Sequence, residues 1–219
     1  MVPPPFITPS ITAAAPLSAL IALTVVIYGP LVALRIAGIT ITTVPSAGAD
    51  LATTDVSAQV YTGATRRARR ATGVFDGIVT GACLLGGGAS LVTALGTQPA
   101  HFRLLFATVL VACLVMQATR HASAVGAWAV WLWSMSTAIS AACAVFIHPG
   151  ATQPSPASIG IAVALATVFV ASGLWAPRVA NMPPTTIAAL EKLESACVII
   201  ALPLGLHLAG VFAAIRGLG

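Results

Sequence analysis

The stretch TRRARRATGVFDGIVTGACLLGGGASLVTAL, residues 65–95, decides the fold of this chain. Its four arginines are followed by an apolar run, residues 73–95, in which Asp76 is the single charged side chain. A transmembrane α-helix needs about 20 predominantly apolar residues to cross the hydrocarbon core, and this run meets that length. It does not alternate between apolar and polar residues, as the strands of a membrane barrel do. The stretch therefore predicts a membrane-spanning helix with a basic end.

Further runs of similar length predict an all-α fold, a polytopic bundle of about six transmembrane helices without a soluble domain. The predicted spans are residues 12–34, 73–95, 102–118, 125–147, 159–175 and 195–215. Pro203 is expected to kink the last span. The expected organisation is a short outer segment with the first span (1–34), a cytoplasmic basic loop (35–71) and five further spans with short loops (72–219).

The composition excludes an ordinary soluble domain. Of the 219 residues, 58% are hydrophobic and only 7% are charged, whereas soluble domains carry about 25% charged residues. The net charge of +5 does not indicate nucleic-acid binding, because the basic residues lie beside apolar runs without interleaved aromatic residues. They favour contact with an anionic lipid surface instead.

The loops differ in their content of basic residues, and this difference predicts the orientation. With six spans, the first, third and fifth loops hold Arg35, Arg66, Arg67, Arg69, Arg70, Arg120, Arg178 and Lys192. The opposite side holds Arg103 and Arg216. The positive-inside rule then places the long loop in the cytoplasm and both termini outside the inner membrane. Residues 58–70 are compatible with a short helix that leads into the second span.

Three glycines of the second span, Gly73, Gly77 and Gly81, recur at every fourth residue and so share one helix face. Such a face lets a neighbouring helix approach closely, and we predict that it serves helix packing. A substrate path along this face, continued by Gly86 and its neighbours, is the alternative. A phosphate-binding loop is excluded, because no strand precedes these glycines and no Lys-Ser/Thr pair follows them.

Asp76 is the one acid inside a predicted span, and His207 is a lone imidazole in the last predicted span. An intramembrane acid is costly, so Asp76 supports the hypothesis of a proton or cation site. Pairing with Arg69, with Arg70 or with a basic residue of another helix is the structural interpretation, and we prefer it. His207 fits a hydrogen bond between helices better than a ligand site. The functional alternative is a secondary transporter or half-transporter that uses Asp76 and His207.

Charged clusters flank the spans on the predicted cytoplasmic side. The predicted lipid or partner contacts are Arg66, Arg67, Arg69, Arg70, Glu191 and Glu194. The two glutamates also suit the N-terminal part of the last helix, where acidic side chains interact favourably with the helix dipole. Both interpretations remain open at this point.

The sequence offers no arrangement typical of catalysis. It contains no Ser/His/Asp or Cys/His arrangement, no HExxH motif and no paired acids at catalytic spacing. The four cysteines each fall in a different apolar run, which is typical of small buried hydrophobic residues. We therefore expect no enzymatic activity, no cofactor and no metal.

Three segments resemble the EccD family, the polytopic membrane component of the mycobacterial type VII (ESX) secretion apparatus. They are LRIAGITITTVPSAGADL at residues 34–51, TRRARRATG at residues 65–73, and LEKLESACVIIALPLGLHLAGVFAAIRGLG at residues 190–219. Family members similarly carry an Arg-Leu-Ala-Gly segment, a Val-Pro with an acid, an arginine-rich entry to the next helix, and a closing span with Leu-Pro-Leu. The resemblance covers nearly the whole chain.

The resemblance implies a non-catalytic scaffold that pairs with further EccD-like copies and braces EccB, EccC and EccE in the inner membrane. The family has an N-terminal ubiquitin-like domain and about eleven spans, so this chain is expected to correspond to the C-terminal half only. In the family, the ubiquitin-like domain contacts the cytosolic face of the secretion ATPase, and this contact is not expected of a chain that corresponds to the C-terminal half. A chain of eleven spans that starts in the cytoplasm ends outside, which agrees with the orientation given by the basic residues.

Overall fold

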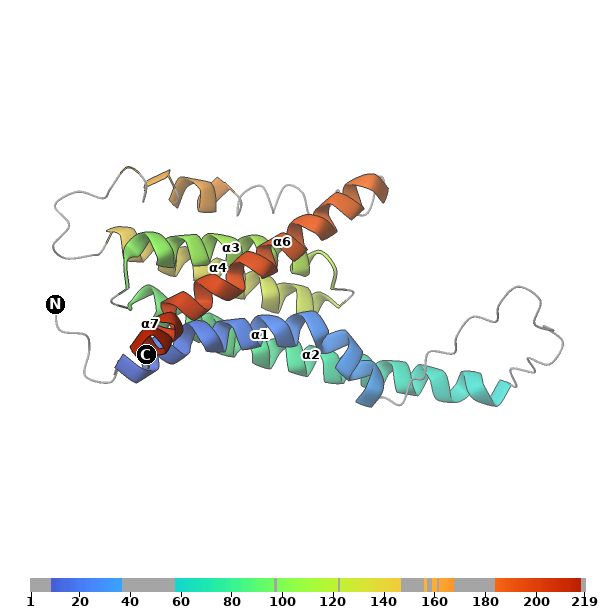
Figure 1. Ribbon diagram of the computed structural model, residues 1–219. Coiled ribbons are helices and arrows are strands. Elements are labelled where there is room, and N and C mark those ends of the chain that lie inside the picture. Colours follow the sequence, from blue (N-terminus) through green and yellow to red (C-terminus); the bar gives the residue numbers. More distant parts are fainter. Residues whose placement is uncertain are drawn as a thin grey trace.

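The computed structural model describes residues 9–36, 58–96, 98–121, 123–146, 156, 159–160, 162–167 and 184–217. The described part is helical and contains no strand, which confirms the predicted all-α class. Its helices are α1 (Pro9–Ile36), α2 (Ala58–Ala94), α3 (Ala100–Ala118), α4 (Ala124–Phe146), α6 (Pro184–Leu208) and α7 (Val211–Gly217), drawn in Figure 1.

Helices α1 to α4 lie side by side, and α6 crosses them obliquely (Figure 1). Helix α1 packs against α2, α2 against α4, α4 against α3, and α3 against α6, which returns to α1. The core lies inside this ring, where Trp133, Phe106 and Leu110 are almost fully buried. Small residues such as Ala19 and Ala22 on α1 are buried too, so the helices can approach closely.

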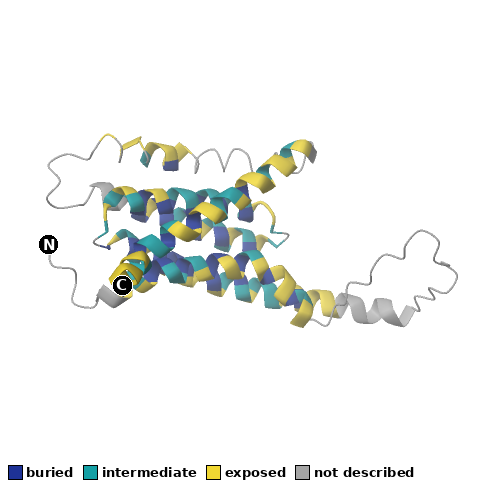
Figure 2. Cartoon of the chain, in the orientation of Figure 1, coloured by how far each residue is buried: buried dark blue, intermediate teal, exposed yellow. Residues whose placement is uncertain are grey.

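The outside of the bundle is apolar. Figure 2 shows exposed positions along the outer faces of the helices, and many of them are large hydrophobic residues, among them Ile21, Leu84, Trp128, Ile199 and Leu202. A soluble protein rarely exposes contiguous apolar patches of this kind. Lipid is the solvent that suits such a surface.

Three described helices are long and apolar enough to cross a membrane: Ile11–Ile36, Arg67–Ala94 and Ala100–Ala118. The bent pair of α6 and α7 adds a fourth candidate if it counts as one span. Helix α4, with 23 residues, lies beside them in the bundle. Most of the predicted fifth span, residues 159–175, lies outside the described residues, although residues 162–167 are helical.

Helix α2 begins at Ala58 and continues unbroken for 37 residues. It therefore begins well before residue 73, where the predicted span starts, and includes the arginine cluster. Residues 37–57 of the predicted loop 35–71 lie outside the described residues, and residues 35–36 end α1. The basic end of α2 extends beyond the neighbouring helices (Figure 1).

The last predicted span is broken beyond Pro203, and the kink expected at Pro203 itself stays a prediction. Helix α6 runs through Pro203 to Leu208, and α7 begins at Val211 after a bend of 54°. Gly210 lies at this bend with a φ of 77°, a left-handed conformation that glycine adopts without a steric penalty. The bend therefore follows from Gly210, and the apolar run 195–215 is shared between two helices.

Candidate functional site: polar clusters at the two ends of the bundle

At one end of the bundle, α6 is joined to the end of α3 by a buried carboxylate. Oε2 of Glu194 lies 2.7 Å from Nη2 of Arg120, and Nε2 of Gln117 donates a hydrogen bond to Oε1. The Glu194 side chain is only 9% exposed, whereas that of Arg120 is 44% exposed. Both carboxylate oxygens are therefore satisfied within the chain. Charge-assisted hydrogen bonds of this kind are the stronger ones, so the cluster fixes where α6 crosses α3.

This geometry corrects the expectation that Glu194 contacts a partner or lipid. The side chain is buried, because α6 passes over the end of α3 at this point. Glu191, one turn earlier, is 59% exposed and lies 3.9 Å from Arg120. An exposed pair at that distance contributes little stability, so the carboxylate of Glu191 is available, and its predicted partner contact stays a prediction.

Asp76 has a different partner from the predicted arginines. Ser123 donates a hydrogen bond to its Oδ1, and the backbone N–H of Gly126 donates to Oγ of Ser123 at 3.1 Å. Ser123 thus caps the N-terminus of α4, whose partial positive charge favours a carboxylate. Among the side chains described, no ion pair joins Asp76 to Arg69 or Arg70.

The exposed arginines lie earlier on α2 than Asp76. Arg67, Arg69 and Arg70 are all exposed on α2, and Arg69 lies two turns, about 10 Å, before Asp76. The side chain of Arg66 and all of Arg178 lie outside the described residues. Arg67, Arg69 and Arg70 are consequently open to lipid or partners, and both contacts stay predictions.

His121 lies beside the Asp76 cap, in the turn between α3 and α4. Its ring centroid is 5.3 Å from that of Phe75, and its Nε2 is buried without a hydrogen-bond partner among the described residues. Burial lowers the pKa of His121 below its ordinary value, although the charge of Asp76 acts to raise it. In this turn, therefore, burial disfavours protonation of the imidazole that lies next to the carboxylate.

We expect the stability of the fold to depend on pH through His121. Because its pKa is lowered by folding, the unfolded chain binds more protons just below about pH 6.5, the ordinary histidine value. Above that pH the free energy of unfolding is not reduced by protonation of His121. It decreases as the pH falls from that value toward the lowered pKa of the folded state. His121→Gln should flatten this dependence in unfolding curves recorded between about pH 7.5 and about pH 5.5. A slope for His121→Gln equal to that of the wild-type chain would contradict this assignment.

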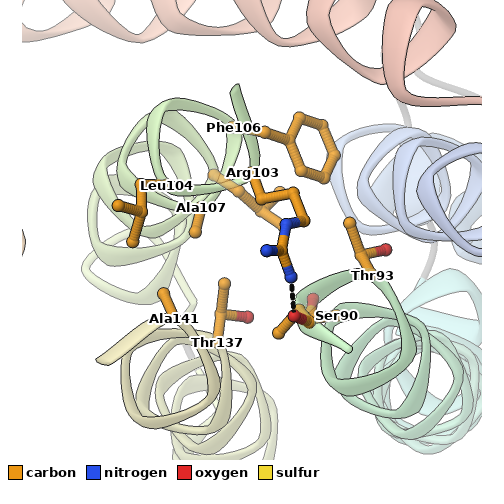
Figure 3. A pocket seen from close by; sticks show the side chains of 10 residues that line it. Ser90, Thr93, Arg103, Leu104, Phe106, Ala107, Thr137 and Ala141 are labelled. Carbon is orange, nitrogen blue, oxygen red and sulfur yellow. Dashed lines mark hydrogen bonds between the residues drawn. The ribbon is translucent and has the colours of Figure 1, made fainter. Parts of the chain in front are cut away.

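At the other end of the bundle, Arg103 reaches into a pocket between α2, α3 and α4 (Figure 3). The residue is only 4% exposed. Its Nη1 donates to the carbonyl oxygen of Ala94 at the end of α2, while its Nε has no partner among the described residues. The polar lining is completed by Ser90, Thr93 and Thr137. A buried cation without an acidic partner is unusual in a membrane bundle.

His207 lies near this same end. Its ring centroid is 4.5 Å from that of Phe102 and 6.4 Å from that of Phe212. Phe102 belongs to the first turn of α3, whereas the Ser123 partner of Asp76 follows the last turn of α3. Asp76 and His207 are therefore separated by about the length of α3, roughly 28 Å, and share no site.

The predicted glycine face and the closest helix approach are on different parts of α2. A Cβ added at Gly73, Gly77 or Gly81 would meet no atom within 4 Å, and all three positions are exposed. At Gly86 a Cβ would lie 2.2 Å from Cζ2 of Trp133 on α4. Gly86 is thus a glycine that the packing within this chain requires, whereas Gly73, Gly77 and Gly81 have no close neighbour among the described residues and their predicted packing role stays a prediction.

Several residues of these clusters were missed by the sequence analysis: Arg103, Gln117, Arg120, His121 and Ser123. One of them carried a signal, since Arg103 lies inside the predicted span 102–118 and a charge at such a position indicates a function. The expectation that cysteines are buried holds for Cys83 and Cys113. Among the described residues, no three His, Cys, Asp or Glu side chains are grouped to hold a metal.

The fold is similar to that of a solved chain described as protomer 1 of the ESX-3 core complex. The TM-score is 0.64 at 17% identity, over 94% of this chain and 46% of the solved one. This chain thus spans less than half of the length of that protein. No curated protein matches its sequence. The EccD-like transmembrane domain matches residues 6–218, and the chain therefore belongs to the EccD family.

Proposed function

We propose that the chain is a non-catalytic scaffold subunit of a type VII protein secretion complex in the inner membrane. Membership of the EccD family over residues 6–218 is the observation that carries this proposal. The proposed partners are further EccD-like copies and the components EccB, EccC and EccE, with anionic lipid on the cytoplasmic side. In the proposed orientation the basic end of α2 lies in the cytoplasm, and both chain termini lie outside.

The exposed face of α2 supports a role in assembly. Gly73, Gly77, Gly81 and Gly88 are exposed along one face, together with Leu84, and none of these glycines has a neighbour within 4 Å of an added Cβ. We call these five residues the glycine face. A helix of another subunit can approach such a surface closely, which is how membrane helices gain packing energy in lipid. We infer that the glycine face meets a second copy or another component.

Gly77→Leu is expected to break the complex while leaving the chain folded. The leucine has room within the chain, but it would hold a partner helix away from the glycine face. Co-purification of the other subunits from solubilised membranes measures the loss. Gly217→Leu on α7, where an added Cβ also meets no atom within 4 Å, is the matched control and should retain the partners. An unchanged yield of partners with Gly77→Leu would contradict the assignment of this face.

The transporter alternative is tested by the neighbouring residue. Because Asp76 and His207 lie at opposite ends of α3, they cannot coordinate one ion together. Asparagine at position 76 keeps an acceptor for the Ser123 hydroxyl, so Asp76→Asn should leave both the complex and protein secretion intact. If proton or solute flux into liposomes required Asp76, the scaffold proposal would be wrong.

A further inference from the structure

The pocket around Arg103 holds a positive charge that nothing in the described chain balances. The three acids that the structure describes, Asp76, Glu191 and Glu194, belong to the clusters at the other end of the bundle. Arg103 lies in the first turn of α3, where the helix dipole is positive and no acid is present. The carbonyl of Ala94 accepts one hydrogen bond from the guanidinium but carries no negative charge.

The guanidinium still has donors to offer. An arginine side chain carries five N–H groups in a planar fork, and the structure engages one nitrogen with Ala94 and leaves the buried Nε without a partner among the described residues. Figure 3 shows the guanidinium directed into the space between the helices. The fork geometry matches the oxygens of a phosphate or carboxylate better than a lone water.

Hydroxyl groups surround the same space. Ser90, Thr93 and Thr137 line the pocket, and each donates its hydrogen bond back to its own helix, at 2.8 to 2.9 Å. The Ser90 hydroxyl also accepts from Nε1 of Trp133 at 3.1 Å. Local bonds to the backbone are weak alternatives for a hydroxyl, so Thr93 and Thr137 can turn toward an anion that enters.

We propose that the Arg103 pocket binds the phosphate of an anionic phospholipid headgroup. The phosphate would accept from the free donors of Arg103 and from the hydroxyls of Thr93 and Thr137, and it would neutralise the buried charge. The N-terminal dipole of α3 adds to the attraction. The chemistry of the site is that of a phosphate, whether it belongs to a lipid or to a free ion.

The position of the pocket favours the lipid as the source. It lies where α2 ends and α3 begins, at an end of two spans, which is the level of the headgroups. It is partly open, and its enclosed part has a free volume of about 20 Å³, which admits one phosphate oxygen to the guanidinium while the rest of the headgroup stays at the mouth. Exposed leucines in the same helical turns, Leu91, Leu95 and Leu105, offer apolar surface for acyl chains. In the proposed orientation this end of the bundle faces outward, so the lipid belongs to the outer leaflet.

The test compares three ligands on the purified full chain in detergent. Phosphatidylglycerol should raise the midpoint of thermal unfolding by about 5 °C. A glycolipid with the same acyl chains and a neutral, phosphate-free headgroup should not, and neither should inorganic phosphate at equal ionic strength. Arg103→Gln should abolish the shift. Arg216→Gln should keep it, because Arg216 is exposed and bonded to its own helix on α7.

A second variant guards against a folding defect in Arg103→Gln. Thr137→Val keeps the shape of the side chain and the cation, and it should weaken retention of phosphatidylglycerol in native mass spectrometry at least threefold. The proposal fails if Arg103→Gln keeps the wild-type shift, if the glycolipid acts equally well, or if Thr137→Val retains the lipid fully. An equal effect of inorganic phosphate would overturn the lipid as occupant. None of these readouts requires a secretion partner, so they are independent of the scaffold proposal.

Discussion

Replacing Gly86 by alanine should strongly destabilise the bundle. The new methyl group would lie 2.2 Å from Cζ2 of Trp133, on a ring that is 2% exposed. The ring cannot simply swing aside, since its Nε1 donates to Ser90 at 3.1 Å. Overpacking of a core commonly costs about 1–3 kcal/mol, and we expect the loss of unfolding free energy here to lie at or above the upper end of that range. The midpoint of unfolding in detergent measures the loss.

Gly88 supplies the matched control for this substitution. It lies on the same helix, is exposed, and has no atom within 4 Å of an added Cβ. Gly88→Ala should be neutral or slightly stabilising, because alanine favours a helix over glycine by about 1 kcal/mol. Equal stability of the two variants would mean that α2 and α4 do not approach each other at Gly86.

Arg120→Met should be the second strongly destabilising change. It leaves the carboxylate of Glu194 buried with Gln117 as its remaining partner. Removing one member of a buried ion pair costs about 3–5 kcal/mol. We expect the lower end of that range, because the Arg120 side chain is 44% exposed and water screens part of its charge. Unfolding midpoints of the single variants report this loss.

A double-mutant cycle separates the ion pair from general packing. Glu194→Gln in the Arg120→Met background removes the buried charge and should recover part of the stability. Glu191→Gln is the control, since that exposed carboxylate lies 3.9 Å from Arg120 and should change stability by less than about 1 kcal/mol. Additive effects of Arg120→Met and Glu194→Gln would show that the two side chains do not interact.

The sequence alone located most of the described helices. The predicted runs 12–34, 102–118 and 125–147 correspond closely to α1, α3 and α4, because the length of an apolar run is set by the thickness of the membrane. The family resemblance was confirmed over residues 6–218. The helix positions follow from apolar runs that are local in the chain. The family assignment follows from motifs that the family shares.

Contacts between distant helices could not be read in the same way. The partner of Asp76 depends on which face of α2 contacts the turn before α4. The residues next to Ser123 in the sequence do not indicate that contact. Glu194 lies close to the exposed Glu191 in the sequence, yet α6 crosses the end of α3 there and buries it. The close approach at Gly86 depends likewise on the position of Trp133.

The unbroken helix α2 has a mechanical consequence. At 37 residues it is about 55 Å long, well beyond the roughly 30 Å of the hydrocarbon core. A tilt of the whole helix by about 10° would displace its basic end by up to about 10 Å. A molecule that binds the arginines at this end is therefore coupled to the packing of the helices in the membrane.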